Sequence, residues 1–190
     1  MNIDLIVQTS YLFLFCLLLA AFEVQIEGKY GWAEKLPTWR PDRSKWYYKA
    51  YSIIMSDKEL TGYHLLVFSF VLIFLHYPYF AGQAWNFSAE LKTISFFFLI
   101  SITWDFLWFV LNPYYGIKRF KSEHIWWHKK WFLFMPKSYY FAIIISALLY
   151  SGFSLNLVLF KEWLLIIGLF LVLILAVVIF SVVFRKNKSA

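Results

Sequence analysis

The sequence predicts an all-α, polytopic integral membrane protein with five transmembrane helices and short interfacial helices in the two cytoplasmic loops. Of its 190 residues, 62% are hydrophobic and only 15% are charged, whereas a soluble domain is about half apolar and about a quarter charged. The apolar residues form blocks of about twenty, the length that an α-helix needs to cross about 30 Å of hydrocarbon. We interpret the chain as a single transmembrane domain, with spans at approximately 4–26, 62–83, 91–112, 138–159 and 162–184.

The first apolar block lies where a secretory signal would lie, but its composition differs. It lacks a positively charged start, carries Asp4 there and is long enough to span a membrane. We therefore expect a retained helix. The fourth block is enriched in small residues, which suits close helix contact. The fifth has almost no polar side chain and should face lipid or another subunit.

Both cytoplasmic loops carry aromatic residues in patterns that predict short helices on the inner leaflet. In the first loop, apolar side chains recur at helical spacing, at Trp46, Tyr47, Ala50, Tyr51 and Ile54. In the second loop, residues 122–132 begin with Ser122, a residue type favoured as a helix N-cap. Tryptophans, which are common at the level of lipid headgroups, follow at Trp126, Trp127 and Trp131.

The distribution of basic residues orients the chain. The loops 27–61 and 113–137 and the C-terminal tail carry sixteen of the eighteen Lys and Arg. The positive-inside rule therefore places the N-terminus outside and the C-terminus in the cytoplasm, in a multi-pass protein of the plasma (inner) membrane. The basic loops should contact anionic membrane lipids. A nucleic-acid partner is excluded, because no segment is long enough to fold a separate basic surface.

Ionisable side chains inside apolar spans are the candidates for function. Each costs about 2.5–3.5 kcal/mol to insert, so it should face the bundle interior and have a partner. Glu23, His64 and Asp105 are the candidate catalytic residues. With the orientation above, all three lie in the cytoplasmic half of their spans. His76 lies towards the outer leaflet and is interpreted as structural.

The predicted topology also places a candidate set of metal ligands, from several parts of the chain, at this same depth in the membrane. Its members are Glu23, Glu27, His64, Asp105, His124 and His128. On a helix, His124 and His128 are one turn apart and could reach one ion. Two imidazoles with carboxylates suit zinc, iron or manganese. Because the chain has a single cysteine, Cys16, it cannot form a cysteine-based metal cluster. The sequence also lacks a glycine-rich phosphate-binding loop, so we predict no nucleotide cofactor.

Two functional hypotheses remain open. In the first, the protein is a metal-dependent membrane enzyme, of the oxidoreductase or hydrolase class, acting on a lipid-like or amphiphilic substrate. In the second, it is a non-enzymatic transporter or channel subunit, or an accessory subunit of a membrane complex, in which the same residues relay ions or hold helices together. Asp105 could then pair with His64, and the loop histidines could contact headgroups. Either hypothesis allows a homo-oligomer or a membrane partner subunit.

Overall fold

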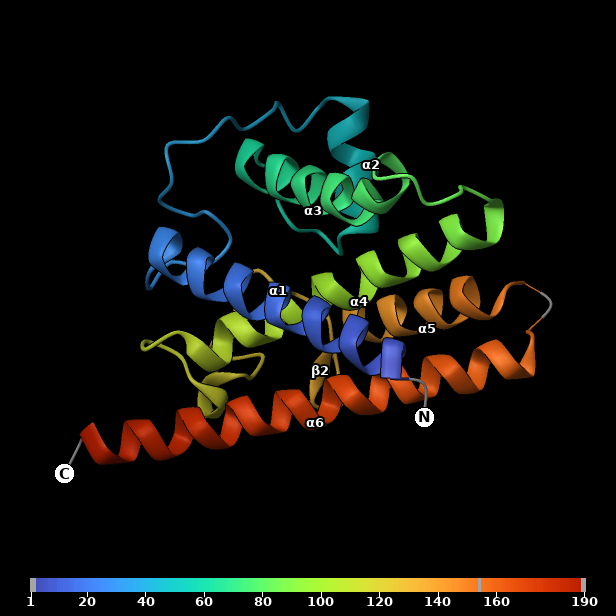
Figure 1. Cartoon of the computed structure of the whole chain (residues 1–190). Coiled ribbons are helices and arrows are strands. Elements are labelled where there is room, and N and C mark those ends of the chain that lie inside the picture. Colours follow the sequence, from blue (N-terminus) through green and yellow to red (C-terminus); the bar gives the residue numbers. More distant parts are fainter. Residues whose placement is uncertain (1–2, 154, 189–190) are drawn as a thin grey trace.

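The computed structural model describes residues 3–153 and 155–188, and the protein in it is 69% helical. This confirms the predicted all-α class. The helices of the described part are α1 (Ile3–Glu27), α2 (Trp46–Ile54), α3 (Gly62–Phe80), α4 (Phe87–Leu111), α5 (Lys137–Ser151) and α6 (Leu157–Lys188). In Figure 1 the five longer helices run back and forth between the two ends of one bundle.

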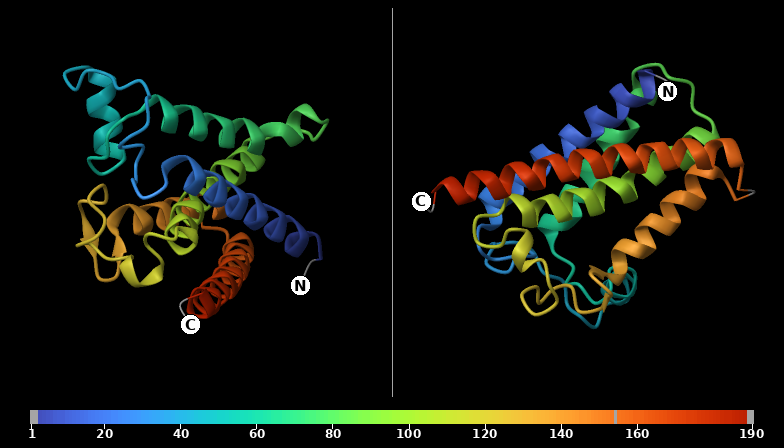
Figure 2. Two further views of the ribbon diagram at one scale, coloured as in Figure 1. Left: turned by 90° about the vertical axis from the view of Figure 1, so that its left-hand side faces the viewer. Right: turned by 90° about the horizontal axis from the view of Figure 1, so that it is seen from below.

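Helix α4 is the centre of the bundle. It packs against α1, α3, α5 and α6, and Figure 2 shows α3 and α6 on opposite sides of α1 and α4. The side chains of Leu99, Ile100, Leu107 and Phe109 on α4 are at most 2% exposed. The helix begins at the N-cap Asn86, whose side chain accepts a hydrogen bond from the Ala89 N–H, and it ends before Pro113, because proline disfavours helix in the residue before it.

Four helices are long and apolar enough to cross a membrane: α1, α3, α4 and the segment Leu157–Lys186 of α6. The fourth predicted span, 138–159, is shorter than expected. Helix α5 has 15 residues, about 22 Å at helical rise, which is less than the hydrocarbon thickness. It ends at Ser151 because Gly152 adopts a φ of 72°, a left-handed conformation that terminates helices. The predicted boundaries at 159 and 162 are therefore corrected, since α6 already begins at Leu157.

The two long loops fold differently from each other. The first contains α2, nine residues long, at the position that the apolar spacing predicts. The second contains no helix over 122–132, where one was predicted. It has a 3₁₀ turn (Ile117–Arg119) and a small hairpin of β1 (Trp131–Phe132) and β2 (Met135–Pro136).

The second loop lacks the predicted helix because its side chains are buried in the bundle. Ile125 and Trp127 are buried while Trp126 between them is exposed, an alternation that an extended chain produces and a helix does not. The ring of Trp127 stacks on Phe109 of α4 at 5.7 Å between centroids. The loop is therefore part of the core, and only some of its tryptophans are free to meet lipid headgroups.

Candidate functional site

Adjacent helix ends bring Glu23, Glu27 and His64 together. The two glutamates lie one turn apart at the end of α1, and His64 lies in the first turn of α3. Their ligand atoms all lie within 4.8 Å of one another, and the three side chains are buried. We call them the acid–histidine group. Three of the residues that the sequence predicts to converge therefore do so, and the group can hold a metal ion.

The cap of α3 sets the orientation of His64. Thr61 is the N-cap, and its hydroxyl accepts from the His64 backbone N–H at 3.2 Å and lies 2.8 Å from ring Nδ1. The ring also stacks on Trp32 at 3.8 Å between centroids. Its other nitrogen, Nε2, is left 3.8 Å from Glu27 Oε1. Metal-binding histidines are commonly held in this way, with one ring nitrogen hydrogen-bonded and the other facing the ion.

The two glutamates are positioned by the chain that follows α1. Gly28 has a φ of 60° and turns the backbone immediately after Glu27. This turn brings the Ala33 N–H to 2.5 Å from Glu27 Oε1. Glu23 Oε1 lies 3.3 Å from the hydroxyl of Tyr63 on α3. Each carboxylate thus has a donor that fixes its direction.

Asp105 belongs to a second, neighbouring group. Its Oδ2 accepts from His128 Nε2 at 2.9 Å and from the Tyr139 hydroxyl at 2.5 Å. Burial lowers the pKa of His128, so the ring is neutral at pH 7 and donates its Nε2–H to the aspartate. We call Asp105, His128 and Tyr139 the aspartate group. The predicted alternative pairing of Asp105 with His64 is not the one that the structure contains, because the nearest carboxylate to His64 is Glu27.

His124 lies apart from both groups. Its side chain is 43% exposed, and its Nε2 is 3.6 Å from the neighbouring Glu123. The spacing argument that joined it to His128 assumed a helix over 122–132. Because that helix is absent, His128 is buried against Asp105 while His124 points to the surface.

Lys58 is the residue that sequence reasoning missed. It is only 7% exposed, and its Nζ lies 4.1 Å from the centre of the Trp32 ring. Burial lowers the pKa of Lys58, while the charges of Asp105 and the two glutamates raise it. In the sequence it counts only as one more basic loop residue. It lies six residues before His64 and three before the N-cap Thr61, and this position is the one signal that places it near the site.

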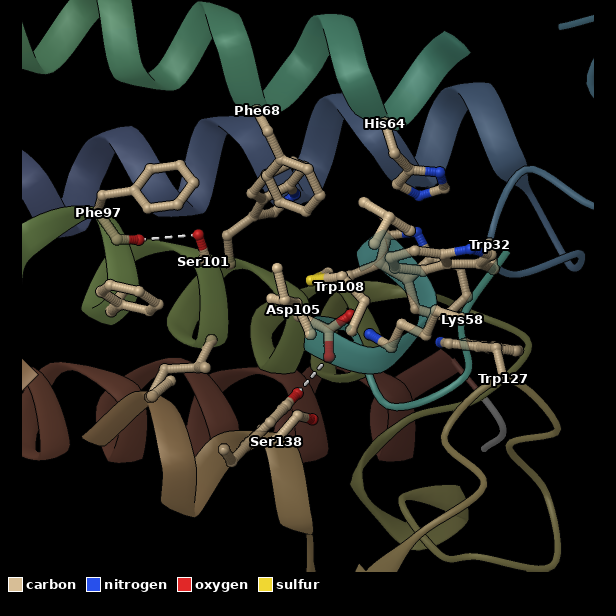
Figure 3. Close-up of a pocket in the computed structure, with 18 of the residues that line it drawn as sticks. Trp32, Lys58, His64, Phe68, Phe97, Ser101, Asp105, Trp108, Trp127 and Ser138 are labelled. Carbon is tan, nitrogen blue, oxygen red and sulfur yellow. Dashed lines mark hydrogen bonds between the residues drawn. The ribbon is translucent and has the colours of Figure 1, made fainter. Parts of the chain in front are cut away.

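The acid–histidine group, Lys58 and two members of the aspartate group, Asp105 and Tyr139, line one cavity of about 350 Å³. Figure 3 shows it lying over α4, between α3 and α5, with His64 and Trp32 near one end and Phe97 near the other. Its first end is polar and is formed by Glu23, Glu27, Lys58, His64, Asp105 and Tyr139. The rest is largely apolar, with Phe68 and Leu72 from α3, Phe97, Phe98 and Ile102 from α4, and Phe141 and Ala142 from α5.

The arrangement combines ligands for a metal ion with a fixed carboxylate beside them. An ion held by one imidazole and two carboxylates keeps a coordination position open for water or substrate. Asp105, fixed by two donors on Oδ2, lines the same cavity. Comparison with protein-family models, curated proteins and solved structures finds no match to this chain.

Proposed function

We propose that the protein is an integral membrane metalloenzyme that acts on an amphiphilic, lipid-like substrate. Glu23, Glu27 and His64 would hold the metal ion, and the substrate would occupy the adjoining cavity. The observation that carries the proposal is the position of the acid–histidine group, which is buried and lies at the polar end of an otherwise apolar cavity. Nitrogen and oxygen ligands of this kind suit zinc, iron or manganese.

The charges around the cavity support a bound cation. The buried Glu23 and Glu27 and the partly buried Asp105 surround its polar end, and Lys58 is the one buried ammonium of the described residues there. Once ionised, the three carboxylates together with Lys58 balance the charge of one divalent ion, so a bound ion would leave no uncompensated charge in the site.

Each group has a role in the proposed chemistry. The ion would polarise the substrate or activate a water molecule. Asp105 would act as the general base, because it is the carboxylate of the cavity that lies outside the acid–histidine group. His128 and Tyr139 would keep it in place. The distribution of basic residues supports a position of this site at the cytoplasmic leaflet of the plasma membrane, where membrane lipids would reach it.

Metal analysis of the purified protein tests the proposal. We expect about one ion per chain after purification in detergent, or after reconstitution with zinc, iron or manganese. Glu27→Gln and His64→Asn should each reduce the bound metal strongly. His124→Asn is the matched control, since this exposed histidine lies outside the acid–histidine group, and it should leave the metal content unchanged.

Two results would contradict a metalloenzyme. One is a chain that stays metal-free after reconstitution with all three metals. The other is a metal content that is the same in wild type, Glu27→Gln and His64→Asn. In either case the buried groups would serve the alternative function of an ion relay or of contacts between helices in a transporter, channel or accessory subunit.

A further inference from the structure

We infer that the cavity beside the acid–histidine group takes a single-chain amphiphile with an uncharged, hydrogen-bond-accepting head, such as a fatty acyl ester. This inference deepens the proposed function and rests on it for the charge of the bound metal ion. It names the substrate class from three features of the cavity: its hydrogen-bond donors, its net charge and its size.

Several donors around the polar end, among them the three that follow, lack an acceptor among the described residues. The Trp108 indole N–H and the Tyr51 hydroxyl are buried without a hydrogen-bond partner. The ammonium of Lys58 is buried and lies over the ring of Trp32, where the ring face offers it no lone pair. All three line the same cavity. Buried donors are normally satisfied, so the ligand that completes this site should supply acceptors, as a carbonyl group does.

The net charge selects an uncharged head. With a divalent ion bound, the three carboxylates and Lys58 leave the polar end neutral. A fatty acid anion or an alkyl phosphate would then bring an uncompensated negative charge into a buried site. A quaternary ammonium head would bring a positive one and would also offer no acceptor to the donors. An ester carbonyl satisfies the donors without changing the charge balance.

The apolar part of the cavity fits one chain. Its volume of about 350 Å³ is at the small end of the range for ligand pockets, which favours one acyl chain inside it over two. Leu65 and Phe141 border it from α3 and α5 and are 48% and 55% exposed. The cavity therefore reaches the side of the bundle between these helices, at the surface that meets acyl chains if α3 and α4 span the membrane.

A second cavity, of about 410 Å³, provides the control. It is lined by the other ends of α3 and α4 and by parts of α1 and α6. Its lysine, Lys92, is paired with Glu162 at 3.6 Å and lies over the ring of Tyr150. The Lys92 ammonium therefore already has a carboxylate partner among the described residues, whereas the Lys58 ammonium of the first cavity has none.

Native mass spectrometry of the metal-loaded protein in detergent tests the inference. The ligands share one chain length and differ in the head: methyl myristate, myristate and tetradecyltrimethylammonium. We expect one methyl myristate per chain, bound about tenfold or more tightly than either charged ligand. Lys58→Met and Trp108→Phe should each weaken its binding by about tenfold. Lys92→Met should leave it unchanged.

The metal content of the same samples separates this inference from the proposed function. If the ion is present and myristate binds as tightly as methyl myristate, the substrate class is wrong and the metalloenzyme stands. If ester binding is the same in wild type and Trp108→Phe, the donor assignment is wrong. This variant removes the indole N–H and keeps an aromatic, apolar side chain, so it remains informative where Lys58→Met fails to fold.

Discussion

Asp105 shows how a single, partly buried carboxylate can join three segments of the chain. It lies on α4, while its two donors come from the second loop and from the first turn of α5. Both bonds end on the same oxygen, so they fix the plane of the carboxylate and leave Oδ1 without a hydrogen bond to a described residue. A carboxylate held in this way is well placed for proton transfer, since its orientation does not depend on the substrate.

His128 should make the stability of the protein depend on pH. Burial lowers its pKa in the folded state, while the unfolded chain titrates near pH 6.5. Below that pH the unfolded state binds more protons than the folded state, so stability falls as the pH decreases from about 7 towards the folded pKa. We expect the midpoint of thermal unfolding in detergent to fall between about pH 7 and about pH 5. In His128→Asn this decrease should be smaller.

The second loop supplies the control for this pH series. His124→Asn removes an exposed histidine four residues earlier and should leave the decrease as it is in wild type. His124 contacts neither Asp105 nor the acid–histidine group, so the difference between the variants reports His128 together with its hydrogen bond to Asp105. A wild-type decrease that His128→Asn does not reduce would show that the protonation of this ring is not linked to folding.

At the level of helices, the N-cap of α3 should stabilise the helix and also tune the proposed metal site. Thr61→Ala removes the acceptor for the His64 backbone N–H, which should cost about 1 kcal/mol of stability. It also removes the partner of ring Nδ1. Loss of such a partner typically lowers metal affinity by about 10–100-fold. Thr61→Ser keeps the hydroxyl and should retain both properties, as measured by thermal unfolding and by competition with a metal indicator.

The cap of α4 separates the two effects. Asn86 caps that helix through the Ala89 N–H at 2.9 Å and does not line the cavity. Asn86→Ala should therefore cost a similar stability and leave metal affinity unchanged. If it lowers metal affinity as much as Thr61→Ala does, the loss reflects general destabilisation, and Thr61 has no specific role in orienting His64.

The long helices were predictable because their signal is local. Apolar blocks of membrane length predict a helix whatever it packs against, and the spacing of apolar residues around Tyr51 was enough to predict α2. The segment 122–132 was not predictable in this way. Its conformation depends on Phe109 and Gly31, which are distant in sequence: a Cβ atom at Gly31 would overlap the ring of Trp127. In the sequence, the only sign of the contact between Gly31 and Trp127 is the glycine itself, which does not identify its partner.

The sequence predicted which residues belong to the site better than it predicted which of them contact each other. Depth in the membrane brings Glu23 and His64 to the same level, so their proximity followed from the spans alone. The pairing of Asp105 with His128 depends on a loop that folds into the bundle, and the spacing of histidines suggested a different partner. Lys58 was missed for a related reason. A lysine beside a span normally orients the chain, and only the fold of the first loop buries this one.

Over the whole molecule, hydrogen bonds join three helix ends at one end of the bundle. The Asn112 side chain, after α4, donates to Gly28 O, after α1, at 2.6 Å. Arg185 of α6 donates to Val110 O at 2.9 Å and to Asn112 O at 2.6 Å. Helices α1, α4 and α6 therefore run in parallel, as Figure 1 also shows. If α4 and α6 both cross the membrane in the same direction, the chain between them must cross back, and α5 is the helix available for this.

Cysteine labelling of intact cells should show whether α5 completes that return crossing. In a Cys16→Ala background, single cysteines replace the exposed residues Gln83, Lys121 and Lys161. We expect a membrane-impermeant maleimide to label Gln83→Cys and Lys161→Cys from outside, and to label Lys121→Cys only after lysis, because the basic loop should be cytoplasmic. A permeant maleimide should label all three and so confirms their exposure. If Lys161→Cys is protected in intact cells, as Lys121→Cys is, the 15 residues of α5 do not cross the membrane. The chain would then have a different transmembrane topology from the predicted one.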